Sequence, residues 1–186
     1  KNEFSGSAGI RPITTQIMVE GPLIKDTLNY IITGRTTYSN WIFSLFNNKT
    51  LRESSASFYD INGKITYDLN KSNKLEFASY LSHDAFRFGS DTVFKYDNNI
   101  LALRWRHIFN SRFFSTFSVN NSFYEYNISS QKHKPESFVL SHKINNTGFK
   151  ADFNLFKDRN ELNFGLDLNR IIILPGSYEP ASDSSL

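Results

Sequence analysis

The sequence predicts an all-β protein, the antiparallel wall of a transmembrane β-barrel, and three observations support this prediction. Apolar and polar residues alternate over long stretches, short turns join these stretches in pairs, and 18 phenylalanines and 9 tyrosines accompany a single methionine. Successive side chains of a strand point to opposite faces, so the alternation indicates strands with one apolar and one polar face. The stretches exceed the about five or six residues usual in soluble sheets and match the roughly 9 to 11 residues with which a tilted strand crosses a bilayer.

The clearest pair of strands lies within residues 58–82. One face of its first strand would carry Tyr59, Ile61, Gly63, Ile65, Tyr67 and Leu69. The opposite face would carry polar residues that include Asp60, Lys64 and Asp68. After a turn at residues 70–73 the alternation resumes with Leu75, Phe77, Ser79 and Leu81. We therefore predict a hairpin with one apolar face toward lipid.

Three further hairpins follow the same pattern. Strands at residues 9–20 and 26–38 precede the first pair, and strands at 101–109 and 113–119, then at 149–155 and 162–168, follow it. Four hairpins predict about eight strands, which form part of a larger barrel. The residues expected to face lipid are Tyr59, Ile61, Ile65, Tyr67, Leu75, Phe77, Leu101, Leu103, Phe117, Phe153, Leu162 and Phe164.

The connections alternate in length, with long segments at residues 41–56, 83–97 and 127–135 between the short turns. Bacterial outer-membrane barrels have short periplasmic turns and long extracellular loops, so we expect the long segments outside the cell. Gly34, Gly63 and Gly165 fall inside strands, where glycine marks a bend, a bulge or a close approach. The alternation through Phe138 and Leu140 does not continue into Phe149, which predicts a bulge or a loop between them.

The composition excludes several classes of protein. No window approaches the about 18 continuous apolar residues of a transmembrane helix. A mean hydropathy of −0.41 still suits a barrel, which exposes only alternate residues to lipid. The absence of cysteine excludes disulfides, thiolate catalysis and cysteine-based metal sites. A net charge of +3 without a run of lysine or arginine gives no indication of nucleic-acid binding.

A soluble β-sandwich or ligand-binding barrel with its apolar face inside would show the same alternation. The dense polar residues on one face of nearly every strand and the uniform strand length favour a membrane wall. The sequence has no initiator methionine or signal peptide at Lys1 and ends in a polar segment at residues 175–186. We expect residues 1–186 to be part of one barrel domain whose plug and remaining strands lie elsewhere.

Several segments resemble the first barrel strands of TonB-dependent outer-membrane receptors. They are Glu20-Gly21-Pro22-Leu23, Lys25-Asp26, Asn29-Tyr30-Ile31-Ile32, Gly34-Arg35-Thr36-Thr37-Tyr38, residues 58–67, Leu69-Asn70, Asn73-Lys74-Leu75, Ser79-Tyr80 and Asp84-Ala85-Phe86. The resemblance implies a plugged barrel of about 22 strands that imports a scarce nutrient across the bacterial outer membrane with energy from the inner-membrane TonB complex. The implied partners are outer-membrane lipid, the plug and remaining strands, the TonB complex and, as a further candidate, a surface-exposed lipoprotein.

A barrel that acts as a surface binding or scaffold module, without energised transport, remains the alternative because it would use the same strands. A plug and a TonB-contacting segment elsewhere in the protein would separate the two. No phosphate-binding loop, nucleophile elbow or histidine pair indicates an enzyme. The sequence therefore predicts no catalytic residue, no metal site and no cofactor.

The candidate ligand contacts are His83, Asp84, Phe86, Arg87, Phe88, Lys95, Arg104 and Arg106. Aromatic and cationic side chains interleave in the segment 83–97 and could hold a ligand by apolar contact and charge. Arg104 and Arg106 share a face and either steer a substrate or belong to a charge ladder that hydrates the wall. His83, Asp84 and Asp91 could bind a cation, but ordinary loop residues are the favoured interpretation of this trio.

Overall fold

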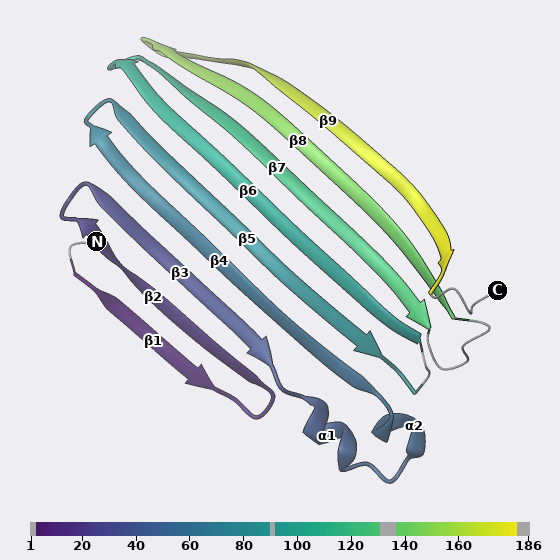
Figure 1. The fold of residues 1–186 in the computed structure, drawn as a ribbon. Coiled ribbons are helices and arrows are strands. Elements are labelled where there is room, and N and C mark those ends of the chain that lie inside the picture. The colour runs from purple at the N-terminus through teal and green to yellow at the C-terminus, as the bar shows by residue number, and fades with distance from the viewer. Residues whose placement is uncertain (1–2, 90–91, 131–136, 182–186) are drawn as a thin grey trace.

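The computed structural model describes residues 3–89, 92–130 and 137–181. Its strands form one antiparallel sheet in which each strand pairs only with its neighbours in sequence, in the order β1 to β9 (Figure 1). The strands are β1 Ser5–Ile10, β2 Thr14–Ile24, β3 Leu28–Thr37, β4 Ser55–Asn70, β5 Asn73–Arg87, β6 Thr92–Asn110, β7 Phe113–Ser130, β8 Phe138–Lys157 and β9 Asn160–Pro180. The predicted all-β class and the long antiparallel strands are confirmed. The sheet is open, because β1 and β9 form its two edges and do not pair with each other.

The described residues form nine strands, one more than the about eight predicted. Residues 9–20, expected to form one strand, divide at a turn in which the Arg11 N–H donates to the Thr14 carbonyl over 2.8 Å. Pro12 lies in this turn and has no N–H for a ladder. β1 therefore folds back onto β2, with Ser5 opposite Glu20 and Ile10 opposite Thr15.

The turns after β2, β4, β6 and β8 lie at one end of the sheet, and the β1–β2 turn lies at the other end together with the long β3–β4 connection (Figure 1). We call the end with the turns after β2, β4, β6 and β8 the turn end, and the end that carries α1 Asn40–Ser44 and α2 Lys49–Arg52 the loop end. Asp26 and Asp158, in two of the turns, adopt φ values of 59° and 55°. Of the predicted long connections, the one at residues 41–56 is confirmed, because residues 38–54 join β3 to β4. The two helices in residues 41–56 were not predicted from the sequence.

The segment 83–97 is not the long loop expected from its polar composition. His83 to Arg87 complete β5, residues 92–97 begin β6, and the two stretches pair with each other from His83 opposite Asp97 to Phe86 opposite Phe94. Removing residues 83–97 would therefore shorten two strands of the sheet. Residues 127–130 likewise belong to β7, whereas residues 131–135 lie outside the described residues.

The register assigns every paired residue to one of two faces. We call the face of Tyr59, Ile61, Ile65 and Tyr67 the belt face and the other the opposite face. In one row across the belt face, Tyr67, Leu75, Trp105, Phe117, Ala151 and Leu166 lie side by side. By this register, all twelve residues predicted to share an apolar face lie on the belt face.

One register shift lies where the sequence predicted a bulge. Ser141 pairs with Ser177 and Lys143 with Leu174, so the extra residue is in β9 and not in β8. The β7–β8 register is unbroken between Leu140 and Phe149. The change of alternation therefore means that Leu140 lies on the opposite face and Phe149 on the belt face. A predicted close approach is confirmed at Gly165, where an added Cβ would press on the Ala151 carbonyl oxygen.

The sheet has no packed core among the described residues. Ala151 is the one buried hydrophobic residue there, and no second sheet covers either face. No helix of the described residues is long and apolar enough to cross a membrane. The apolar side chains of the belt face are thus left uncovered in this structure.

Candidate functional site

An apolar belt crosses the belt face near the turn end. It contains Ile65, Tyr67, Leu75, Phe77, Leu101, Leu103, Trp105, Phe117, Val119, Phe149, Phe153, Leu162, Phe164, Leu166 and Leu168. Ring contacts connect its strands, with centroids 5.3 Å apart for Trp105 and Phe117 and 5.2 Å apart for Phe153 and Phe164. Leu103 is 47% exposed and Leu168 is 54% exposed. A contiguous exposed apolar surface of this kind marks a site of contact with another protein, a ligand or a membrane.

The opposite face of the same strands carries charges at the level of the belt. Glu76 accepts from Lys64 at 2.9 Å and lies 3.7 Å from an Arg104 nitrogen. Lys150 and Asp152 lie 3.2 Å apart, and a polar hollow forms between Arg104 and these two residues. One set of strands thus separates a hydrocarbon-like surface from a wet, charged one, as the alternation of each strand requires.

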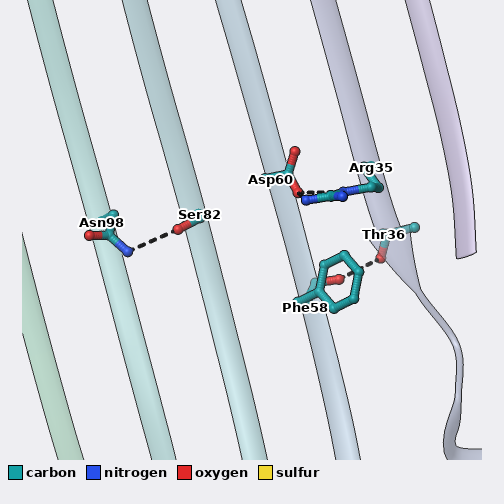
Figure 2. A network of polar contacts seen from close by, with 6 residues as sticks. All are labelled: Arg35, Thr36, Phe58, Asp60, Ser82 and Asn98. Atoms are coloured by element: carbon teal, nitrogen blue, oxygen red, sulfur yellow. Dashed lines mark hydrogen bonds and ion pairs between the residues drawn. The ribbon is translucent and has the colours of Figure 1, made fainter.

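Like Glu20 on the same opposite face, Asp60 is a buried carboxylate and is only 8% exposed. Arg35 holds it, because Nε and Nη2 of the guanidinium lie 2.8 Å and 2.7 Å from the same Asp60 oxygen (Figure 2). The guanidinium also lies over the Phe58 ring, 5.1 Å from its centroid. Next to this pair, the Asn98 amide donates to the Ser82 hydroxyl over 3.1 Å (Figure 2). The row thus carries one polar contact between β3 and β4 and another between β5 and β6.

Replacing Arg35 with alanine is expected to lower the free energy of unfolding by about 1 to 3 kcal/mol, because Asp60 would keep a desolvated carboxylate without its charged donor. Urea unfolding of the variant in a bilayer measures the loss. Lys74→Ala is the matched control, since its partner Asp68 has a side chain that is 42% exposed and water can replace the lysine. Equal losses in the two variants would show that burial of Asp60 does not matter.

Toward the loop end the apolar residues change faces. Beyond Leu101 and Val119 the belt face bears Asn99, Asp97 and Glu125, whereas the opposite face bears aromatic residues. We call the latter set the distal aromatic patch. Its members are Phe86, Phe94, Tyr96, Tyr126, Ile128 and Leu140, which lie in two adjacent rows of the register.

The rings of the distal aromatic patch stack along the sheet. Tyr96 and Tyr126 lie 4.7 Å apart with an interplanar angle of 14°, and Tyr126 stacks on His142 at 6.1 Å. Phe86 and Phe94 lie 6.5 Å apart, and Phe86 is 43% exposed. Burial and the neighbouring Tyr96 raise the pKa of the Tyr126 phenol above its ordinary value, so it remains a neutral donor. The patch therefore offers flat apolar faces edged by hydroxyl groups.

The belt face is charged at the level of this patch. Burial would raise the pKa of Glu125, but hydrogen bonds from Asn127, Lys143 and Ser141 and the Lys143 charge lower it below the ordinary value. The Lys143 Nζ lies 3.2 Å from a Glu125 oxygen. His83 contacts Asp97 over 2.6 Å and stacks on Tyr59 at 5.5 Å. Charged groups thus occupy the belt face near the loop end.

The structure does not bring the eight predicted ligand contacts together. Asp84, Phe86, Arg104 and Arg106 lie on the opposite face, while His83, Arg87 and Lys95 lie on the belt face. Phe88 lies in the β5–β6 connection and is 54% exposed. Arg104 and Arg106 do share a face, as predicted, and Arg104 belongs to an ion-pair ladder.

Sequence reasoning missed Tyr126, Ile128 and Leu140 as members of the patch. The signal was present, because the apolar residues of β7 change from odd to even positions between Val119 and Tyr124. The trio expected as an alternative cation site is not assembled, since neighbours His83 and Asp84 point to different faces and Asp91 lies outside the described residues. No cluster of metal-ligating side chains occurs in the described part of the chain. No protein-family model and no curated protein matches this sequence.

Proposed function

We propose that this chain is part of the wall of a TonB-dependent receptor in the bacterial outer membrane, which imports a scarce nutrient. The observation that carries the proposal is the uncovered apolar belt on strands whose opposite face is charged. A soluble sheet would bury such a belt under a second layer, and the described residues provide none. The resemblance of residues 20–38 and 58–86 to the first barrel strands of these receptors supports the same assignment.

Closure into a larger barrel follows from the two open edges. Unpaired backbone N–H and C=O groups cost several kcal/mol each in hydrocarbon, and only closed barrels remove every edge. Further strands beside β1 and β9 would complete the ring and enclose the opposite face as a wet lumen. The ion pairs of Glu76, Arg104 and Lys150 then keep the lumen wall hydrated, the role favoured for such a ladder.

The distal aromatic patch is the proposed place of ligand contact. It lies on the lumen side near the loop end, where extracellular ligands would enter. Ligand sites combine apolar surface with a few placed polar groups, and here Asp84 lies in the same row as Tyr96 and Tyr126. A plug inside the lumen and the TonB complex below it would supply gating and energy.

A surface scaffold without transport is the second candidate, and exposed residues of the loop end favour it. Trp41 and Leu45 of the α1 region are 48% and 70% exposed. The Trp41 indole donates to the Pro12 carbonyl over 3.2 Å, which ties α1 to the β1–β2 turn. Such an anchored apolar surface could meet a lipoprotein partner, and this role would not require uptake.

Uptake by an alanine variant of the patch separates these functions. Phe94→Ala, Tyr96→Ala and Tyr126→Ala together are expected to lower TonB-dependent accumulation of the transported nutrient at least about tenfold, because about 1.4 kcal/mol of lost contact is a factor of ten. A ferric siderophore, cobalamin and a labelled oligosaccharide serve as the probes. The control, His83→Ala with Lys95→Ala, changes the belt face at the same level and should leave uptake unchanged. TonB-independent surface function with no uptake of any probe would favour the scaffold.

A further inference from the structure

We infer that lipid covers the belt face only from the turn end to the level of Leu81, Leu101, Val119, Phe149 and Leu168, and that the belt face beyond this boundary stands in water. The inference rests on the proposed membrane wall and adds where the membrane ends on it. The strands of β4 to β9 would then project well beyond the bilayer at the loop end.

The first support is the similar length of the apolar stretch, counted from the turn end to the boundary, on several strands. On four strands the stretches run from the turn end as follows: Asn73 to Leu81 in β5, Asn110 to Leu101 in β6, Lys157 to Phe149 in β8 and Asn160 to Leu168 in β9; the stretch Phe113 to Val119 in β7 is shorter. The four stretches are similar in length although their turns are staggered along the sheet (Figure 1). Each approaches the roughly 9 to 11 residues with which a tilted strand crosses hydrocarbon.

The second support is a step in polarity at the boundary. Asn121 and Thr147 are partners in the row that follows Val119 and Phe149, and Asn121 donates to the Thr147 hydroxyl over 2.8 Å. Farther toward the loop end are the Glu125–Lys143 and His83–Asp97 pairs. Charged groups on the lipid face of a barrel are destabilising at the midplane and are tolerated near or beyond the interface. Hydrocarbon therefore ends before these pairs.

The third support is that the charges change faces together with the apolar residues. At the level of the belt, the ion pairs of the described strands lie on the opposite face, as with Lys64 and Glu76. Above the boundary, the Glu125–Lys143 and His83–Asp97 pairs of β5 to β8 lie on the belt face, whereas the Arg35–Asp60 pair of β3 and β4 stays on the opposite face. The large apolar exceptions on the belt face beyond the boundary are Tyr59, Val93, Phe123, Val139 and, on the edge strand β9, Ile172 and Leu174. The strand pairing of β6 to β8 continues without a shift through the boundary. The two zones therefore differ in their side chains and not in their backbone pairing.

Spin-label accessibility along β6 tests the boundary, since these 186 residues contain no cysteine to compete for the label. Single variants Leu103→Cys, Leu101→Cys, Asn99→Cys and Lys95→Cys of the whole barrel are labelled in phospholipid vesicles. Oxygen, which concentrates in hydrocarbon, should relax the label more than a nickel chelate at residues 103 and 101. The preference should reverse at residue 95, with the crossover near residue 99. Ala102→Cys, on the opposite face, should favour nickel despite its depth.

Asn127→Cys on β7 repeats the distal measurement with an independent variant, and only variants that retain the folded, heat-modifiable form are compared. Oxygen preference that persists at residues 95 and 127 would overturn the boundary while leaving the membrane wall intact. Nickel preference at residues 103 and 101 as well would overturn the proposed membrane wall itself. The two failures are therefore distinguishable.

Discussion

Replacing Leu103 with arginine is expected to lower the free energy of unfolding of the barrel in a bilayer by about 2 to 4 kcal/mol, the cost of a cation near the midplane of a lipid face. Leu103 lies in the middle of the apolar belt, between Phe77 and Val119 in the register. No carboxylate partner is present in that row to offset the charge. Urea titration of the reconstituted barrel, followed by its heat-modifiable migration, measures the loss.

The neighbouring position provides the matched control. Ala102 is adjacent in β6 but on the opposite face, where it lines a hollow with Asn62, Lys64 and Tyr80. A new arginine there would face water, so Ala102→Arg should cost much less than Leu103→Arg. If the two variants lost equal stability, or if Ala102→Arg lost more, the belt face would not be the lipid face.

The chain of residues 1–186 expressed alone is expected to aggregate or to refold poorly in detergent. The edge strands β1 and β9 of its sheet do not pair with each other. Each unpaired backbone group in hydrocarbon costs several kcal/mol. β9 adds to the problem, because nearly all its side chains are exposed, Leu162 to 55% and Ile173 to 62%. Size-exclusion chromatography and heat-modifiable migration in gels report the outcome.

The whole protein, refolded under the same conditions, is the control for this experiment. A monodisperse, heat-resistant species formed by the 186 residues alone would mean that β1 and β9 can close the sheet. The proposal that these strands belong to a larger barrel would then have to be abandoned. Aggregation of the short chain beside clean refolding of the whole protein supports it.

The β4–β5 hairpin was predictable because both of its strands alternate without interruption on either side of a polar turn. The β1–β2 hairpin was not, because Ser5, Gly6 and Ser7 carry no apolar alternation. β1 is held in the sheet by its pairing with β2, and the residues of β1 alone do not reveal this pairing. Strand prediction succeeded where the pattern was strong on both partners.

The candidate site shows a different limit of the sequence. Residues 83–97 look like a loop by composition, yet His83 and Asp97 face each other in a paired ladder. The apolar residues of β6 and β7 do change parity along the sequence, but only the register shows that Phe94 and Tyr96 lie on the same face as Tyr126. The eight predicted contacts were divided between faces for the same reason.

The neighbour-to-neighbour pairing of β1 to β9 has a consequence for how such a sheet can assemble. Every pairing closes a loop no longer than one hairpin connection, and the entropy lost on closing a loop grows with its length. Each strand can therefore add to the one formed just before it, without the search that distant strand pairs impose. Order in sequence and order in space coincide, so the topology allows the sheet to form by the addition of one strand at a time from one edge.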